Sequence, residues 1–154
     1  MKKILSVLFI IMVLTACGSN TANKDNNPKT INNDYKFIGE SEHWKAEYSY
    51  KGTELWDEDD GKTAYSNKDS YELVLKYKGS LEELSFMKKL EYTYETISGS
   101  GNKTETYTDP PSEKVFTTSG SSEGGSKVSK DEIIKITVKW DDFYESFELH
   151  NKVK

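Results

Sequence analysis

The 154-residue chain contains no arginine, a single cysteine and only two histidines. Arginine carries the planar side chain that binds phosphate and carboxylate groups best, so its absence removes the usual anchors for such ligands. The formal net charge is −5, so the chain also lacks the basic surface that nucleic-acid-binding proteins need. We therefore expect no nucleic acid partner, and we interpret the acidic surface as a solvated one.

The scarcity of cysteine and histidine excludes further kinds of site. Cys17 has no second cysteine with which to form a disulfide or a thiolate metal site. His43 and His150 are too few for a histidine-rich metal site, and we interpret both as surface or strand-end residues. No phosphate-binding glycine loop, dinucleotide fingerprint or serine hydrolase motif is present. We therefore expect no cofactor, identify no catalytic residue and predict that the protein is not an enzyme.

The one long apolar run, residues 4–16, lies at the N-terminus behind two lysines. As a helix it would span only about 20 Å, which is short of the ~30 Å hydrocarbon core of a bilayer. A signal peptide is therefore favoured over a transmembrane helix. The run ends in Leu14-Thr15-Ala16-Cys17, which resembles a bacterial lipobox. An ordinary secretory cleavage site is the alternative, but it would place bulky Leu14 where a small residue is required.

This motif predicts cleavage after residues 1–16 and lipidation of Cys17 by a diacylglyceryl group, usually with an N-linked acyl chain such as palmitate. Two or three acyl chains anchor a protein stably, so we expect it on the extracytoplasmic face of the cell membrane. Cleavage would change the net charge from −5 to −7 because two lysines are lost. Residues 17–34, rich in Asn, predict a disordered tether with a reach of roughly 20–25 Å. Residues 35–154 are enough for one domain.

Alternating apolar and polar residues predict short strands along this domain. The pattern is clear at 44–51, 71–77, 90–97, 134–140 and 143–149, and weaker at 103–108 and 115–118. Turn-prone residues fill the intervening segments 52–69, 98–102 and 119–126. The lack of a βαβ rhythm favours an all-β fold, an antiparallel two-sheet Ig-like sandwich of about seven strands. A small closed barrel is the alternative.

Residues 80–90 fit two local structures. Ser80 and Glu83 have the spacing of a helix capping box, and nearby apolar residues have helical spacing. Strand-like alternation nevertheless begins at Leu90. We favour a helical or irregular turn over 80–84 followed by a strand to about 97, with a helix over 81–90 as the alternative.

Two segments resemble a known group of proteins. The run from Phe37 to Trp44 resembles the F-x-G-E-S-x-N-W opening of small, uncharacterised lipoproteins from Bacillus and related Firmicutes, and residues 134–149 resemble their final hairpin. His43 stands where the group has Asn, and residues 141–144 replace the more usual Asn-Gly or Asp-Gly turn. The resemblance implies a compact β-sandwich on a lipid anchor. It implies no known reaction, so no functional residue is carried over.

An acidic run, residues 57–61, suggests calcium. Its spacing does not match an EF-hand loop, because Lys62 stands where that loop requires glycine. Only a looser Ca²⁺ site made of Asp57, Asp59 and Asp60 is conceivable, and a solvated acidic loop is the better interpretation.

Three tryptophans differ in their context. Trp44 and Trp140 are in phase with strand alternation and are predicted to lie in the core. Trp56 lies outside a clean alternation, beside the acidic run. Because exposed tryptophans often anchor partners, Trp56 is the best candidate for a partner contact.

The sequence thus favours a membrane-anchored, non-enzymatic binding or interaction module, with an envelope protein or a wall polymer as its partner. One alternative is an envelope hydrolase acting on peptide or glycan, which would need a carboxylate pair or a Ser-Lys pair. The other is a Ca²⁺-binding loop at the acidic run.

Overall fold

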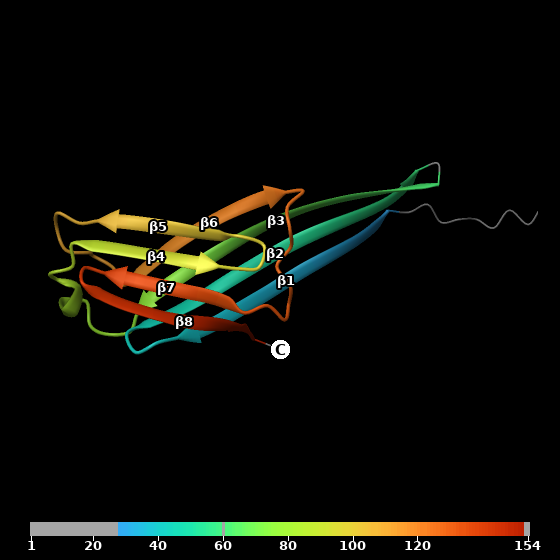
Figure 1. Ribbon diagram of the computed structural model, residues 1–154. Coiled ribbons are helices and arrows are strands. Elements are labelled where there is room, and N and C mark those ends of the chain that lie inside the picture. The colour runs from blue at the N-terminus through green and yellow to red at the C-terminus, as the bar shows by residue number, and fades with distance from the viewer. Residues whose placement is uncertain (1–27, 60, 153–154) are drawn as a thin grey trace, which may run out of the picture.

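The computed structural model describes residues 28–59 and 61–152, without the side chain of Asp59, and these form two packed β-sheets (Figure 1). The elements are β1 (Lys29–Glu40), β2 (Trp44–Asp59), β3 (Lys62–Tyr77), a 3-10 turn η1 (Glu82–Leu84), β4 (Lys89–Glu95), β5 (Ser100–Thr106), β6 (Val115–Glu123), β7 (Ile134–Trp140) and β8 (Phe143–Asn151). Within these residues no helix has the length and apolar character needed to cross a membrane. The predicted signal peptide and Cys17 lie outside the described residues.

The strands form one antiparallel, hydrogen-bonded order, β5-β4-β7-β8-β1-β2-β3-β6, which folds into two layers. The layers join where β1 meets β8, at only two residue pairs, Phe37–Asn151 and Ile38–His150. The predicted all-β, antiparallel sandwich-like fold is confirmed, with eight strands instead of about seven. The alternative, a closed barrel, is not formed, because β5 and β6 are the two terminal strands of the order and do not pair with each other among the described residues. A side chain spans that opening: Lys103 Nζ donates to the carbonyl of Thr117 at 2.9 Å.

The core lies between the two sheets and is built by strict alternation. Every second residue of β7, from Ile134 through Trp140, is buried, and the residues between them are not. Trp44 of β2 is fully buried, and its ring centroid lies 5.5 Å from that of Trp140. The prediction that both tryptophans belong to the core is therefore confirmed. Burial of large side chains of this kind stabilises the fold by about 1.5–3 kcal/mol each.

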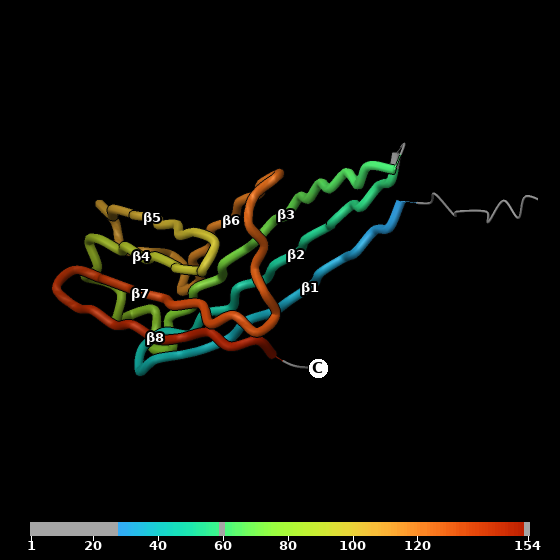
Figure 2. The backbone as a smooth tube through the Cα atoms, turned by 45° about the vertical axis from the view of Figure 1, so that its right-hand side comes forward, coloured from blue at the N-terminus to red at the C-terminus, as the bar shows by residue number. Residues whose placement is uncertain are grey.

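The first three strands extend beyond the sandwich (Figure 1). Residues 29–32 pair with 53–56, and residues 54–59 pair with 62–67, while the pairing of β3 with β6 begins only at Lys68. We call this three-stranded extension the arm. The segment after β6, residues 124–133, crosses the sheet at the base of the arm (Figure 2). We call it the strap, and Asn67 fixes its start by donating from Nδ2 to the carbonyl of Gly125 at 2.7 Å.

Three predicted loop or tether segments proved to be strand. The tether was predicted to extend to residue 34, but β1 begins at Lys29, so this boundary is wrong by six residues. Likewise β2 and β3 continue through most of 52–69, and β6 includes residues 119–123. These stretches contain few apolar residues, and neighbouring Leu55 and Trp56 fall on opposite faces, so they give no clean alternation signal. Their backbone groups pair with a neighbouring strand that is already in place, and this pairing extends the sheet.

The ambiguous segment contains a short turn. Residues 82–84 form η1 and β4 begins at Lys89, which confirms the favoured interpretation and shows that the 81–90 helix was wrong. Glu83 accepts a hydrogen bond from the backbone N–H of Ser80 at 3.0 Å, as the capping-box spacing suggested. The chain does not continue as a helix because strand β4 supplies Leu90 and Tyr92 to the core.

Candidate functional site

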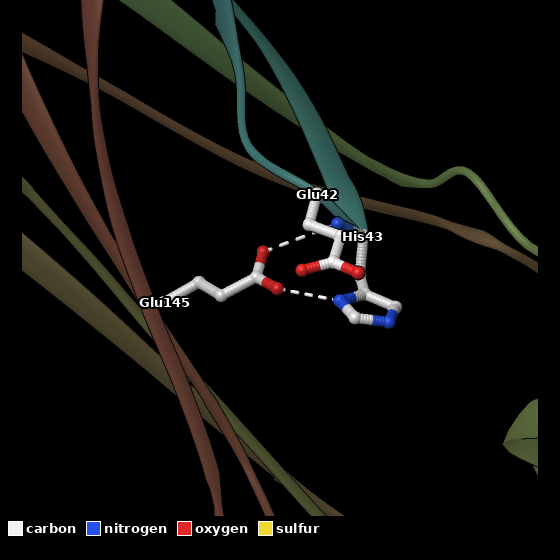
Figure 3. Close-up of side chains that lie close together, drawn as sticks. All are labelled: Glu42, His43 and Glu145. Atoms are coloured by element: carbon white, nitrogen blue, oxygen red, sulfur yellow. Dashed lines mark hydrogen bonds and ion pairs between the residues drawn. The ribbon is translucent and has the colours of Figure 1, made fainter.

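The turn between β1 and β2 holds a cluster of polar side chains against β8 (Figure 3). Glu145 of β8 accepts a hydrogen bond from Ser41 Oγ at 2.5 Å through one carboxylate oxygen, Oε2. The other oxygen, Oε1, lies 2.5 Å from His43 Nδ1, and the backbone N–H of His43 donates to Oε2 at 3.2 Å. Residues about a hundred positions apart in the chain thus form one clamp, which we call the Glu145 clamp.

The charges of the clamp reinforce each other. The hydrogen bond to Glu145 raises the pKa of His43 above its ordinary value of 6.5, although partial desolvation opposes it. Desolvation would raise the pKa of Glu145, but the hydrogen bonds from Ser41 and His43 outweigh it, and the pKa lies below 4.5. The pair is therefore fully charged over a mildly acidic range of pH.

The chemistry open to this cluster is limited. Ligand atoms of Glu42, His43 and Glu145 lie within 4.8 Å of one another, close enough for a metal ion. A carboxylate bonded to histidine also supplies two of the three members of a hydrolytic triad, but Ser41 bonds to the carboxylate and not to the imidazole. The nucleophile–base contact is therefore missing within the described clamp. Its geometry accounts for a structural role, which is to hold the β1–β2 turn against β8.

A second group of polar residues lines a cleft of about 310 Å³ between the two sheets, which we call the tyrosine cleft. Tyr48, Tyr71 and Tyr94 form its base, with ring centroids 5.0–5.5 Å apart. Asp69 lies at its edge and accepts hydrogen bonds from Tyr50 at 3.3 Å and from Ser122 at 2.9 Å. Serines of the β4–β5 turn, of β6 and of the strap complete the lining.

Glycines on the edge strands make room for these rings. Gly101 of β5 pairs with Tyr94, and Gly120 of β6 pairs with Tyr71. A Cβ at Gly101 would lie 2.5 Å from the Tyr94 ring, and one at Gly120 would lie 2.7 Å from the Tyr71 ring. Each tyrosine therefore packs directly over a neighbouring strand's backbone, which fixes its orientation.

The third feature is an aromatic pair on the arm. Trp56 and Tyr65 face each other across β2 and β3, with ring centroids 4.5 Å apart, and they are 40% and 44% exposed. They continue the face that buries Trp44 and Tyr48 farther along β2, since side chains alternate with a period of two. The second sheet does not cover this part of β2 and β3, so the face that carries Trp56 and Tyr65 is partly exposed to solvent here.

An ion pair between a buried carboxylate and a half-exposed lysine separates the arm's aromatic pair from the sandwich. Glu54 is only 5% exposed, and its carboxylate lies 2.8 Å from Lys127 Nζ of the strap. Asn33 of β1 donates to the same carboxylate at 2.9 Å. The hydrogen bonds from Lys127 and then Asn33 hold the pKa of Glu54 below its usual 4.5. Together with Tyr65 of β3, whose hydroxyl lies 3.5 Å from Glu54 Oε2, this ties three strands and the strap at one carboxylate.

The residues singled out from the sequence fall in different places. Trp56 is exposed on the arm, and Asp57 lies beside it near the β2–β3 turn, where its Oδ1 accepts the Glu58 N–H at 2.9 Å. The Asp59 side chain, Asp60 and Cys17 lie outside the described residues, so the Ca²⁺ and lipidation predictions stay predictions. His150 is exposed near Glu148, as expected of a surface residue.

Sequence reasoning missed both the Glu145 clamp and the tyrosine cleft. The clamp gives no signal in sequence, because Ser41 and Glu145 are 104 positions apart. The cleft left a weak signal: Gly101 and Gly120 flank strand-like residues, and glycine inside a strand often marks a site where another group packs closely. Both glycines were instead assigned to loops.

Comparisons with protein-family models, with curated proteins and with solved structures gave no match to this chain.

Proposed function

We propose that the protein is a lipid-anchored extracytoplasmic lipoprotein whose domain is a non-enzymatic interaction module for an envelope protein. The observation that carries the proposal is the exposed Trp56–Tyr65 pair on the arm. Large aromatic side chains in contact with each other and with water are typical of the anchor residues of protein interfaces. The partner would offer an apolar pocket for this pair.

The surroundings of the pair support a protein partner. Tyr65 OH approaches Glu54 at 3.5 Å, so the apolar pair is bordered by a fixed polar network. The acidic run begins on its other side at Asp57, which is exposed. An apolar centre with a charged rim is the usual anatomy of a protein interface, and this rim calls for basic residues on the partner.

The position of the arm in the chain links it to the proposed anchor. Lys29, at the start of β1, is the register partner of Trp56. Cys17 lies twelve positions earlier, and that length of chain spans at most about 40 Å. Lipidation of Cys17 would therefore keep the arm close to the membrane, within reach of other envelope proteins.

The anchor is tested by replacing Cys17 with Ser in the full chain, expressed in a bacterial host that processes lipoproteins. We expect the wild-type chain in the membrane fraction with an acyl modification detected by mass spectrometry. The Cys17→Ser chain should lack the modification and leave that fraction. Unchanged fractionation and mass would contradict lipidation.

The interface is tested by placing a photo-crosslinking amino acid at position 56 of the membrane-bound full chain. The matched control is position 86, where Phe86 is 86% exposed but lies outside the arm. We expect a discrete protein adduct from position 56 only, and its loss when Tyr65 is changed to Ala. Equal adducts from both positions, or adducts only to a glycan polymer, would refute a protein interface at the arm.

Exposure predicts that these changes leave the fold intact. Trp56→Ala and Tyr65→Ala should each alter the free energy of unfolding by less than about 1 kcal/mol, because both side chains are partly solvated and lie outside the core. A lost adduct with an unchanged unfolding curve would thus report on the interface itself.

A further inference from the structure

The tyrosine cleft is separate from the arm and has a distinct chemical character. It opens between the two sheets, near the ends of edge strands β5 and β6, and the strap closes one side of it. Its volume of about 310 Å³ lies at the lower end of the range for small-molecule pockets. The arm's Trp56 and Tyr65 do not line it.

Hydroxyl groups dominate the lining. Tyrosines, serines and Thr96 supply most of it, Asp69 supplies one carboxylate, and no lysine or histidine is among the lining residues. Burial raises the pKa of Tyr48 and Tyr94, and it raises that of Tyr50 to about 12. These tyrosines therefore stay protonated at neutral pH, and each hydroxyl can donate as well as accept a hydrogen bond.

One of these hydroxyls is open to the cleft. Tyr48 is only 3% exposed, yet its hydroxyl is not among the fully buried, unpaired side-chain atoms of the described residues, which are Trp44 Nε1 and Tyr92 OH. An accessible hydroxyl without a protein partner among the described residues keeps its capacity to donate and to accept a hydrogen bond. Because Tyr48 lines the cleft, a bound molecule is a natural partner for this hydroxyl.

The ring geometry excludes an aromatic cage for a cation. Tyr48 and Tyr71 stack nearly parallel at 5.3 Å, and Tyr94 lies against both. Their faces cover one another, whereas a cation requires an open face. A ligand in the cleft can therefore contact the ring edges that carry the hydroxyl groups. It can also donate hydrogen bonds to the carboxylate oxygens of Asp69.

From this arrangement we propose that the tyrosine cleft binds one sugar unit of a neutral carbohydrate. Ring hydroxyls of the sugar would donate to Asp69 and accept from tyrosine and serine hydroxyls. The rings are held over Gly101 and Gly120, so the cleft is formed before binding. The proposal goes beyond the arm interface and does not depend on it, because it uses other residues and another class of ligand.

The test is calorimetric titration of the full chain in a polyoxyethylene detergent, which has no sugar headgroup to compete. The probes are the trisaccharide of N-acetylglucosamine and maltotriose, with an acidic galacturonate trimer and choline as negative probes. We expect at least one neutral trisaccharide to bind and both charged probes to fail. Binding of neither trisaccharide, or tighter binding of choline, would overturn the proposal.

Substitutions in the tyrosine cleft test whether the carbohydrate binds there. Tyr48→Phe should weaken it about tenfold, the usual effect of one lost hydrogen bond, and Asp69→Asn should weaken it further. The matched control is Tyr92→Phe, the same change at a buried tyrosine outside the cleft, which should leave affinity unchanged. Trp56→Ala should also have no effect, so a failure of the arm interface is distinguished from a failure of this site. Equal affinity in wild type and Tyr48→Phe would overturn the placement, and an unchanged circular dichroism spectrum confirms that each variant is folded.

Discussion

At the scale of single residues, the Glu145 clamp shows how a few polar side chains fix a turn. Glu145 accepts from Ser41 and from the backbone of His43, so the carboxylate satisfies donors that a short turn would otherwise leave open. Hydrogen bonds to a charged acceptor stabilise more than neutral ones, by about 1.5–3 kcal/mol each in buried settings. His43 is 41% exposed, so solvent screens its ion pair and its contribution is smaller.

The clamp predicts a pH dependence that the variant His43→Asn would remove. The raised pKa of His43 stabilises the fold below pH 6.5, and this contribution is lost as pH rises through the folded-state pKa. The lowered pKa of Glu145 stabilises it above pH 4.5 and is lost as pH falls. Urea unfolding across pH should therefore show the largest difference in the free energy of unfolding between wild type and His43→Asn between about pH 4.5 and 6.5. A difference that is constant from pH 4 to 9 would show that the ion pair contributes nothing.

At the scale of elements, the junction of β1 and β8 holds the two sheets together through a close backbone approach. A Cβ at Gly39 would lie 2.0 Å from the carbonyl oxygen of Glu148. That atom belongs to the backbone and cannot rotate away as a side chain can. Gly39 is the glycine of the F-x-G-E-S-like opening, so the position has a physical reason here: only glycine allows β8 to pair with β1.

Gly39→Ala should therefore destabilise the fold by about 3 kcal/mol or more, since overpacking against backbone is not relieved by a rotamer change. The control is Gly99→Ala in the β4–β5 turn, where an added Cβ meets no atom within 4 Å. Thermal unfolding of the two variants compares them directly. Similar midpoints for both would mean that the β1–β8 junction is not needed.

At the scale of the whole molecule, the strap joins the sandwich to the arm. Its Lys127 bonds Glu54 of β2, while Glu132 accepts the backbone N–H of Ile97 in the β4–β5 turn at 2.5 Å. The strap thus ties the first sheet to the second, and Asn151 of the β1–β8 junction donates to its Lys130 carbonyl at 2.7 Å. It also forms a wall of the tyrosine cleft, so its position bears on the proposed carbohydrate site.

Glu54→Gln should loosen the strap without unfolding the sheets, because it removes the charge that Lys127 faces. We expect a loss of about 1–2 kcal/mol and faster hydrogen exchange in residues 124–128, measured by mass spectrometry. In the wild type the same protection should fall only as pH drops below 4.5, since the pKa of Glu54 is lowered. The control is Glu47→Gln, which breaks an exposed pair with Lys36 and should change little. Equal exchange in both variants would show that Glu54 does not hold the strap.

The sequence by itself determined the fold class and the strands that build the core. The stretch from Ile134 to Trp140 was predicted with its observed bounds, because a half-buried strand must alternate and burial enforces that alternation. Signals of this kind are local, because they depend on residues that are neighbours in the sequence and not on which elements pack together. The exposure of Trp56 has a tertiary cause instead, because the residue is in phase with buried Trp44 and Tyr48 but lies on the arm, beyond the facing sheet.

Only the tertiary structure decided the arm, the clamp and the cleft. The arm's strands carry few apolar residues, so they are held mainly by backbone pairing with their neighbours and by the Trp56–Tyr65 contact across β2 and β3. The clamp and the cleft combine side chains from elements distant in sequence, such as Ser41 with Glu145. These side-chain contacts follow from the strand order and from the β1–β8 junction. No local sequence pattern specifies either of them.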